Sequence, residues 1–573
     1  MKKSRKQKEA KPQTAPKRES SAAPEAALWS RWWPWLAALV GLIVVFQVYG
    51  PALNGEFVFD DRTAPFFSPH LTDRFSAWVG QLRPMLMLSF WIDYKIAGGN
   101  DPGRYHQTGL LLHFVASVLI SLIVAKLAEW AGVAGKMRAA LGVFAGAIFL
   151  LHPLQTESVA YVSERAEALS VMFYYAAFAV FVYKPGESIT LARSLAIVAL
   201  FGAALASKEH TLTLPALILM TDYFWSRGGL KKNIRLYAIF AVAGAAGAVV
   251  VWRVIFASNT AGFHLREITP ATYFFTQCRV VWNYIRLFFL PAGQNIDPDV
   301  ALSHSIFEHG AILGLLALAA LLAGAWIYRK KFPLASFGVF VFLLLVAPTS
   351  SFVPLTDVMA ERRAYLPLAG LLLVCCEFLR RLKFNQVVWT GAAAVALCCL
   401  LTYKRAEVWS TPLALWSDAV EKSPAKYRPR FQLAYAQFEV QDCADSAKSY
   451  ATASHLGPVQ PDLLVDWALA LDCAGQWQQA LAKLQQALTS LNTAAVHTQI
   501  AKVYAEHQHL PEALDELNQA QRLDPGFDVT YYYRGNIDAM KGDRPAAIRE
   551  YQRALALNPQ NQPARTALAQ ISR

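Results

Sequence analysis

Residues 110–127 read LLLHFVASVLISLIVAKL, and Lys126 is the one Lys, Arg, Asp or Glu in this stretch. A helix of about 20 mainly apolar residues spans a bilayer. Runs of similar character recur between Trp33 and Tyr403 and then stop. Over the whole chain of 573 residues, 55% are hydrophobic and 17% are charged, which is too apolar for a soluble enzyme of this size. The sequence therefore predicts a polytopic helical membrane domain followed by a polar domain.

Lys/Arg bias in the loops predicts the number and direction of the spans, because cytoplasmic loops carry an excess of these residues. Basic loops such as SRGGLKKNIR (226–235) and YRKK (328–331) alternate with less basic ones. This alternation predicts about eleven spans within residues 29–405, a long extracytoplasmic loop at residues 50–105, and a seventh span over Tyr237–Ala257. The apolar stretch Tyr273–Leu290 would break the alternation, so we interpret it as an interfacial or re-entrant helix on the outer side.

The two ends of the chain follow from this topology. Residues 1–28 include KKSRKQK and show no apolar periodicity, which is typical of a disordered basic tail, here expected in the cytoplasm. An odd number of spans then places residues 406–573 outside the cytoplasm. Much of the formal net charge of +13 lies at helix ends, so it indicates orientation and not a nucleic-acid partner.

The polar C-terminal part repeats. Small residues recur at intervals of 34, 33 and 34 positions at Ala434, Ala468, Ala501 and Gly535, and again at Ala453, Ala487, Ala520 and Ala554. This period is that of tetratricopeptide repeats, whose helix pairs stack into a superhelix with a concave surface. We expect about four repeats and hence an all-α chain.

The seven cysteines show no metal-type spacing. The adjacent pairs Cys375-Cys376 and Cys398-Cys399 lie in apolar runs and are interpreted as core residues. Cys443 and Cys473 lie among the repeats, where they could pair or remain reduced.

Charged residues gather in the loops predicted to face outward, in the strings FVFDDR (57–62), HPLQTESVAYVSERAEAL (152–169), SKEHTLTLP (207–215) and DVMAERRAYLP (357–367). A partly desolvated carboxylate can deprotonate an acceptor hydroxyl, and arginines can hold a phosphate through paired donors. The combination suits transfer from a lipid-linked phosphate donor. Asp60 and Asp61 are the candidate catalytic carboxylates. The candidate substrate-binding residues are Arg83, His106, His152, Glu157, Arg165, Lys208, Glu209, Arg286, Glu361, Arg362 and Arg363.

Structural explanations stand beside each of these functional ones. Asp60 and Asp61 could form a solvated turn, Arg362 and Arg363 could anchor lipid headgroups, and Lys208 and Glu209 could form a local ion pair. The histidines are expected to pack helices or orient substrate, because none has a ligand spacing with a nearby carboxylate.

The order of FVFDD, RPxxxxSF, YHxxxxLLH, LHPxxTESVAYVSERAE, SKE, AERRAYLP and the repeats resembles the transmembrane-and-tetratricopeptide O-mannosyltransferase family. That family and its bacterial relatives lie within the GT-C glycosyltransferase superfamily. The resemblance implies a polyprenyl-phosphate sugar donor, such as an undecaprenyl- or dolichyl-phosphate sugar, with transfer outside the cytoplasm and inversion at the anomeric carbon. It implies that Asp60 or Asp61 is the base, without saying which, and that Arg362 and Arg363 face the donor phosphate. No metal is expected to be obligatory, and the use of a divalent cation is left open.

The function expected from these observations is that of a bacterial inner-membrane glycosyltransferase, in contact with membrane lipid. Its periplasmic repeats would recruit an acceptor protein for O-glycosylation. A second hypothesis keeps the chemistry but makes the acceptor a glycan or lipid. A third makes the chain a non-catalytic membrane scaffold whose repeats gather proteins, in which case Asp60 and Asp61 would tolerate substitution.

Overall fold

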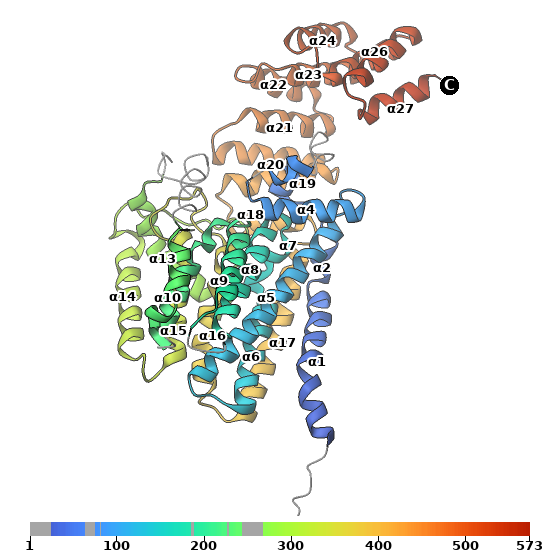
Figure 1. Cartoon of the computed structure of the whole chain (residues 1–573). Coiled ribbons are helices and arrows are strands. Elements are labelled where there is room, and N and C mark those ends of the chain that lie inside the picture. The colour runs from blue at the N-terminus through green and yellow to red at the C-terminus, as the bar shows by residue number, and fades with distance from the viewer. Residues whose placement is uncertain are drawn as a thin grey trace, which may run out of the picture.

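The structure is a computed structural model that describes residues 24–63, 75–80, 82–184, 188–225, 229–242, 244 and 268–572. Every regular element in these ranges is a helix, which confirms the predicted all-α class for the described part of the chain. A helical bundle lies below a curved solenoid in Figure 1. Most of the predicted tail 1–28, most of the predicted span Tyr237–Ala257 and part of the predicted loop 50–105 lie outside the described residues.

The bundle runs from α1 to α17. Its elements are α1 (Pro24–Val48), α2 (Gly50–Leu53), η1 (Phe59–Thr63), α3 (Phe75–Val79), α4 (Pro84–Ala97), α5 (Pro102–Trp130), α6 (Gly135–Leu151), η3 (Pro153–Gln155), α7 (Thr156–Ala160), η4 (Val162–Glu164), α8 (Arg165–Val182), α9 (Leu191–Leu205), η5 (Glu209–Thr213), α10 (Leu214–Trp225), α11 (Gly229–Lys232), α13 (Pro270–Phe289), η6 (Glu308–Gly310), α14 (Ala311–Ile327), α15 (Pro333–Val346), η7 (Ala347–Thr349), η8 (Glu361–Ala364), α16 (Leu368–Leu379) and α17 (Phe384–Val408).

Small residues let the bundle helices approach closely. On α15 and α16, Gly338 and Gly370 face each other, and a Cβ atom on either would lie 2.4 or 2.5 Å from the carbonyl oxygen of the other. On α6, a Cβ at Gly146 would lie 2.8 Å from the Cβ of Ser121 on α5. Glycine at such contacts is typical of helices that pack through van der Waals contact and not through exclusion of water.

Four helices in the described ranges are long and apolar enough to cross a membrane. They are Pro102–Trp130, Val162–Val182, Glu308–Ile327 and Phe384–Val408, and the bent pair Gly135–Leu151 and Pro153–Ala160 would be a fifth. Other apolar helices are shorter, at 10–17 residues. The predicted count of eleven spans is therefore not confirmed and stays a prediction.

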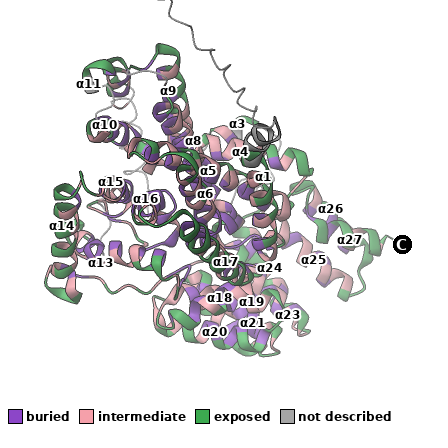
Figure 2. Cartoon of the chain, turned by 90° about the horizontal axis from the view of Figure 1, so that it is seen from below, coloured by how far each residue is buried: buried purple, intermediate pink, exposed green. Residues whose placement is uncertain are grey.

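Two of these long apolar helices show their side chains to the outside of the bundle. Only 11% of the most apolar stretch of α14, and 6% of that of α17, is buried within the molecule. Trp389 of α17 and Leu313 of α14 are 76% and 69% exposed. The exposed outer faces of both helices are green in Figure 2. Such faces fit a lipid surrounding.

The solenoid consists of paired helices, as the repeat period predicts. Its elements are α18 (Pro412–Lys422), α19 (Tyr427–Glu439), α20 (Cys443–Leu456), α21 (Pro461–Cys473), α22 (Trp477–Leu488), α23 (Ala494–Glu506), α24 (Leu510–Leu523), α25 (Asp528–Met540), α26 (Arg544–Leu557) and α27 (Gln562–Ile571). The four pairs from α19 to α26 carry the small residues that recur in the sequence. All eight of these residues are buried.

Gly535 shows why these positions are small. A Cβ atom at Gly535 of α25 would lie 2.6 Å from the ring of Tyr551 on α26. The ring of Tyr551 therefore occupies the space that a larger residue would need, and the pair packs at short range. The predicted tetratricopeptide-type solenoid is confirmed for the described residues.

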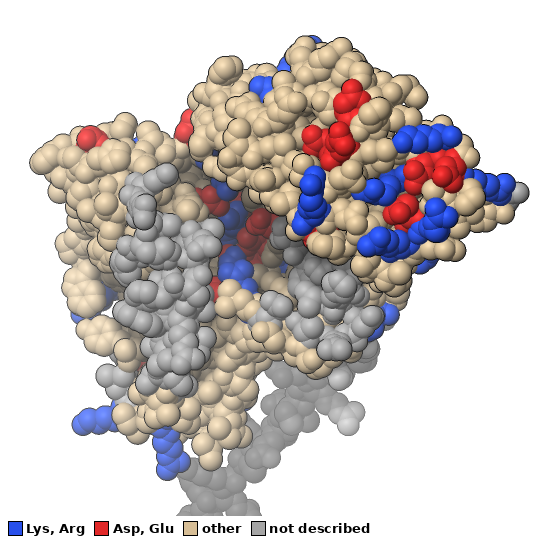
Figure 3. Space-filling view, turned by 90° about the horizontal axis from the view of Figure 1, so that it is seen from above, with Lys and Arg blue, Asp and Glu red and all other residues tan. Residues whose placement is uncertain are grey.

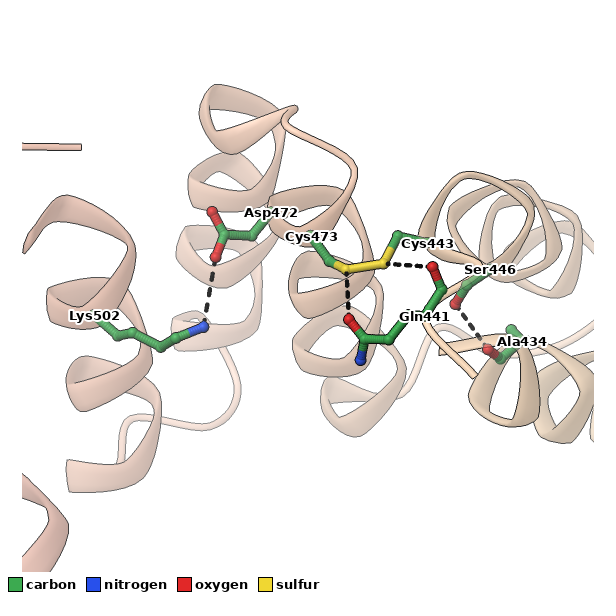
Figure 4. Close-up of a disulfide and its surroundings, with 7 residues drawn as sticks. All are labelled: Ala434, Gln441, Cys443, Ser446, Asp472, Cys473 and Lys502. Atoms are coloured by element: carbon green, nitrogen blue, oxygen red, sulfur yellow. Dashed lines mark hydrogen bonds and ion pairs between the residues drawn. A yellow bond between two sulfur atoms is a disulfide. The ribbon is translucent and has the colours of Figure 1, made fainter. Parts of the chain in front are cut away.

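A disulfide joins Cys443, the first residue of α20, to Cys473, the last residue of α21, with their Cα atoms 5.7 Å apart. The sequence left this pairing open. Figure 4 shows the bond bridging the first repeat to the second, beside Gln441. Disulfides persist in oxidising compartments and are rare in the cytosol.

Removing this disulfide is expected to lower the stability of the solenoid by about 3–4 kcal/mol, because the bond closes a loop with a sequence separation of 30 residues. The test compares the thermal unfolding of the full chain with that of the double variant Cys443→Ser/Cys473→Ser. A reducing agent should lower the unfolding temperature of the wild type and leave the double variant unchanged. Equal unfolding temperatures for both proteins without reductant would contradict the prediction.

Candidate active site

The two predicted catalytic aspartates lie on η1, just after a tightly held turn. At Gly55, a Cβ atom would lie 2.9 Å from the carbonyl oxygen of Trp409, the residue after α17. His106 of α5 lies 3.2 Å from the carbonyl oxygen of Gly55 through Nε2. A carbonyl only accepts, so this nitrogen is the donor. His106 therefore fixes the turn that leads to the aspartates.

Asp61 is a buried structural link. Its Oδ1 accepts hydrogen bonds from the backbone N–H and the hydroxyl of Ser163, at 2.6 and 2.5 Å. Its Oδ2 accepts from the backbone N–H of Val58 at 3.1 Å. Burial raises the pKa of Asp61 to about 7, against the opposite effect of these hydrogen bonds. Oδ1 thus joins η1 to η4, and Oδ2 holds the backbone just before η1.

Asp60, the preceding residue, is exposed and lines a cavity. Its backbone N–H donates to the hydroxyl of Tyr161 at 3.1 Å. Burial of part of the carboxyl raises the pKa of Asp60 above its usual value, and a hydrogen bond with Tyr161 opposes this. Glu164 raises the pKa further, while Arg362 and Arg428 lower it. An accessible carboxylate with a raised pKa has the properties of a general base.

The chain after α6 presents further carboxylates on short helical segments. Pro153 follows α6, and the path bends by 50° between Gly135–Leu151 and Pro153–Ala160. Proline lacks the N–H that a continuous helix needs. The short elements η3, α7 and η4 follow before α8 begins at Arg165. This broken path brings Glu157 and Glu164 to one end of the bundle.

Arg362 of η8 is the centre of the resulting charge cluster. One terminal nitrogen lies 2.5 Å from Glu157 and the other 3.3 Å from Asp357, while Nε lies 3.0 Å from Glu164. Its backbone N–H also donates to Glu157 at 3.0 Å. Burial alone would lower the pKa of Arg362, but these carboxylates raise it well above the usual value. Three acidic partners already balance its charge, so this geometry favours a positioning role.

Lys208 and Glu209 belong to two different ion pairs and not to one local pair. Lys208 lies 2.6 Å from Glu164 and 2.8 Å from Glu167. Glu209 receives two hydrogen bonds from Arg83, at 3.0 and 3.1 Å. Burial alone would raise the pKa of Glu209, but Arg83 lowers it below the usual value. Each pair joins the segment around η5 to a different part of the bundle.

Arg363 forms no ion pair with a carboxylate among the described residues. Its guanidinium donates to the backbone carbonyls of Asp357 and Val358, at 2.5 and 3.2 Å, and to the hydroxyl of Tyr273 at 3.4 Å. The side chain is half-buried. An arginine held by neutral acceptors retains the charge that a phosphate needs.

The solenoid also contributes to the cluster. Arg428 of α19 lies 2.7 Å from Asp297 and 2.6 Å from Asp357, and Lys426 also pairs with Asp297. Burial alone would raise the pKa of Asp357, but Arg428 and Arg362 lower it. In Figure 3, charged side chains of both signs lie in a hollow beside the solenoid. The first repeat therefore packs directly on the charged end of the bundle.

Three predicted substrate-binding residues have structural partners away from Arg362. Arg165 is buried and lies 2.7 Å from Asp93. His152 accepts a hydrogen bond from the N–H of Leu154 through Nδ1 and lies 2.9 Å from the carbonyl oxygen of Phe288 through Nε2. Arg286 is exposed and donates to the carbonyl oxygen of Ala292. The structure does not bring these three into the cluster.

Glu361 is buried next to Arg362 but points to a different loop. One oxygen accepts from the backbone N–H of Asn295 at 2.6 Å and the other from the side chain of Gln294 at 2.9 Å. Burial raises the pKa of Glu361 to about 7. Its contacts fix the loop that also carries Asp297, so Glu361 helps to position Asp297 in the cluster.

Sequence reasoning missed four residues of this region: Tyr161, Asp297, Lys426 and Arg428. Tyr161 lies within a quoted motif, but a tyrosine in an apolar run gives no signal of its contact with the Asp60 backbone. Asp297 and Arg428 are 131 positions apart, and only the folded arrangement brings them together. Basic residues at the start of the repeats were the only available hint.

Among the described residues there is no group of three or more His, Cys, Asp or Glu side chains arranged to hold a metal ion. The carboxylates of the cluster are paired with Arg362, Lys208 and Arg428 instead. The charge balance of the cluster thus comes from side chains of the chain itself.

Comparison with known proteins finds tetratricopeptide repeats in the solenoid. A model described as tetratricopeptide repeat matches residues 529–561, which contain all of α26 and all of α25 except its first residue, Asp528. The solved structure of YrrB, a tetratricopeptide-repeat protein with an unusual peptide-binding site, is 22% identical with a TM-score of 0.23, and covers 31% of this chain and 88% of that one. A TM-score this low establishes no closer relationship.

The sequence is similar to several proteins named protein O-mannosyl-transferases. One from Caenorhabditis elegans is 23% identical over 74% of this chain and 63% of its own length. TMTC3 from Homo sapiens is 22% identical over 84% of this chain and 58% of its own length. Tmtc2 from Drosophila melanogaster is 28% identical over 37% of this chain and 24% of its own length. The predicted resemblance to this family is confirmed, and the chain spans less than two thirds of each of these relatives.

Proposed function

We propose that this chain is a membrane glycosyltransferase that moves a sugar from a polyprenyl-phosphate donor to a protein hydroxyl. The observation that carries the proposal is the position of Asp60. Its accessible carboxyl lies where the charge cluster of the bundle meets the first repeat, beside a cavity formed by both. The similarity to protein O-mannosyl-transferases supports mannose as the first sugar to test.

In the proposed reaction, Asp60 accepts the proton of the acceptor hydroxyl as its oxygen attacks the anomeric carbon. The bond from that carbon to the phosphate oxygen breaks, polyprenyl phosphate leaves with the electron pair, and the configuration inverts. Arg363, which has no acidic partner among the described residues, stabilises the charge of the leaving phosphate. Arg362 and Lys208 hold the carboxylates of the cluster in place. No metal step is required, and a divalent cation remains a variable to test.

We propose a GT-C type arrangement with about eleven spans in residues 29–405 and the repeats of residues 406–573 outside the cytoplasm. In a bacterium this places the N-terminus in the cytoplasm and the repeats in the periplasm, across the inner membrane. The disulfide Cys443–Cys473 supports an oxidising compartment for the solenoid, and the exposed apolar faces of α14 and α17 support contact with lipid. The concave face of the repeats is proposed to recruit the acceptor protein.

The proposed function is tested with purified protein and a panel of synthetic polyprenyl-phosphate sugars, by mass spectrometry of the polyprenyl phosphate released. Wild type should act on at least one donor, and Arg363→Gln should lose about a hundredfold in rate, as expected when one charged donor to the developing anion is removed. The control is Arg138→Gln, an exposed arginine of α6 that pairs with Glu129, which should keep full activity. Absence of release from every donor would contradict the proposal and favour a scaffold.

The pH dependence of transfer is expected to depend on the solenoid. Only the ionised carboxylate accepts a proton, so the rate should fall as the pH drops through the pKa of Asp60. Partial burial raises this pKa, and the charge of Arg428 lowers it. Replacing Arg428 by glutamine removes an influence that lowers the pKa of Asp60, so the acidic limb of the rate profile should move to higher pH.

The matched control for this shift is Lys448→Gln, a charge change on an exposed residue of α20 that pairs with Asp445. Its rate profile should coincide with that of the wild type. A profile for Arg428→Gln that stays in place, or moves to lower pH, would show that Arg428 does not act on the base.

A further inference from the structure

A cavity of about 270 Å³ lies between η1 and the first helices of the solenoid. Its walls come from three parts of the chain that are distant in sequence. Its lining includes Phe59, Asp60 and Arg62 of η1, Trp416 of α18, Tyr435 of α19 and Asp466 of α21. The cavity therefore joins the proposed base to the repeat domain.

Aromatic rings form much of the wall. Phe59 meets Trp416 edge to face, with ring centroids 5.9 Å apart. Tyr435 carries the guanidinium of Arg62 over its ring, 4.9 Å from the centroid. Arg62 itself lies 3.5 Å from Glu439, so an acidic residue already balances its charge. One cation thus already rests on an aromatic wall of this cavity, as cations commonly do.

Asp466 is the unusual residue of the cavity. Unlike Asp297, Asp357 and Glu164, it has no lysine or arginine partner among the described residues. Its side chain is partly buried in the wall, and this burial, with the nearby Asp462, raises its pKa to about 6. A partly buried carboxylate without a cation is costly to hold ionised, and a positive ligand would remove that cost.

We propose that this cavity binds a lysine or arginine side chain of the acceptor polypeptide. Asp466 would form an ion pair with this side chain, and the aromatic rings of the wall would pack against it. The inference rests on the proposed function, because Asp60, which lines the same cavity, would receive the acceptor hydroxyl. The acceptor would then carry a basic residue within a few positions of the modified serine or threonine. The combination of a carboxylate without a cation and aromatic rings favours a cation over a neutral sugar ring.

Binding is measured by fluorescence polarisation on the full chain in detergent, so that it does not depend on turnover. The probe is a fluorescein-labelled peptide with one threonine and one lysine, and its partner carries norleucine, an uncharged side chain, in place of lysine. Wild type should bind the lysine peptide about tenfold more tightly. Asp466→Asn should bind both peptides equally. Asp445→Asn, the same change on an exposed residue of α20, should keep the preference.

A charge exchange keeps the test decisive if Asp466→Asn folds poorly. Asp466→Lys should prefer a glutamate peptide over the lysine peptide. Equal binding of the lysine and norleucine peptides by wild type, or a preference that survives in Asp466→Asn, would overturn the proposal. Tighter binding of free mannose or a mannosyl peptide than of the lysine peptide would assign the cavity to sugar instead. A lysine preference without sugar release from any donor would retain this binding site and reject the proposed function.

Discussion

Replacing Asp60 by asparagine is expected to lower the rate of sugar transfer about a thousandfold, within the range that loss of a general base produces. Asparagine keeps the shape of the side chain but cannot accept the proton of the acceptor hydroxyl. The Asp60 side chain is exposed, so the thermal unfolding temperature should stay close to that of the wild type. The measurement is single-turnover sugar transfer, with thermal unfolding on the same preparation.

The neighbouring Asp61→Asn is the informative comparison, because its two oxygens accept hydrogen bonds from Val58 and Ser163. An amide presents a donor to at least one of these N–H groups, so this variant should lose about 1–3 kcal/mol of stability. Any activity that remains should belong to the fraction that is folded. Full activity in Asp60→Asn, or a chemical defect without a stability defect in Asp61→Asn, would reverse the two assignments.

Replacing Arg362 by glutamine is expected to lower the free energy of unfolding by about 3–5 kcal/mol, more than any other single substitution proposed here. This is the usual result of removing one partner of a buried ion pair. Arg362 holds Glu157, Glu164 and Asp357 together, and the side chain of Glu157 is only 1% exposed. Without the guanidinium, Glu157 is left buried without a cation, while Glu164 and Asp357 keep Lys208 and Arg428 as partners. The apparent unfolding temperature of detergent-purified protein measures the loss.

A second substitution separates loss of charge balance from loss of packing. Glu157→Gln on the background of Arg362→Gln removes the carboxylate that is left without a cation, so it should recover part of the lost stability. Arg138→Gln, on an exposed ion pair, should change stability by less than about 1 kcal/mol. If Arg362→Gln were as stable as Arg138→Gln, the cluster would not hold this end of the bundle.

Local patterns predicted the elements well, because each depends on residues close in sequence. The repeat period placed the paired helices of the solenoid, since Ala434, Ala468 and their counterparts must be small where helices touch. Apolar runs likewise predicted the helices of the bundle within the described residues. The number of membrane crossings does not follow from the apolar runs alone, because several apolar helices, such as Leu368–Leu379, are shorter than a bilayer requires.

The sequence indicated which charged residues gather near the site, but not which of them form ion pairs and hydrogen bonds with one another. The structure pairs Arg362 with Glu157 and brings Arg362 near enough to Asp60 to lower its pKa. Their pairing depends on three-dimensional geometry, so the sequence could not show that Asp61 is sequestered by Ser163 or that Arg428 of the solenoid enters the cluster. Arg165 was predicted to bind substrate, and the structure shows it buried in an ion pair with Asp93, a partner that the sequence did not indicate.

The most direct test of the whole account is the product itself. Purified wild-type protein is incubated with polyprenyl-phosphate mannose and a cell-envelope protein extract, and modified residues are mapped by peptide mass spectrometry beside an Asp60→Asn control. The account predicts hexose on serine or threonine side chains with wild type and none with Asp60→Asn. Hexose found only on glycan or lipid would contradict the protein acceptor, and equal labelling by both proteins would contradict the role of Asp60.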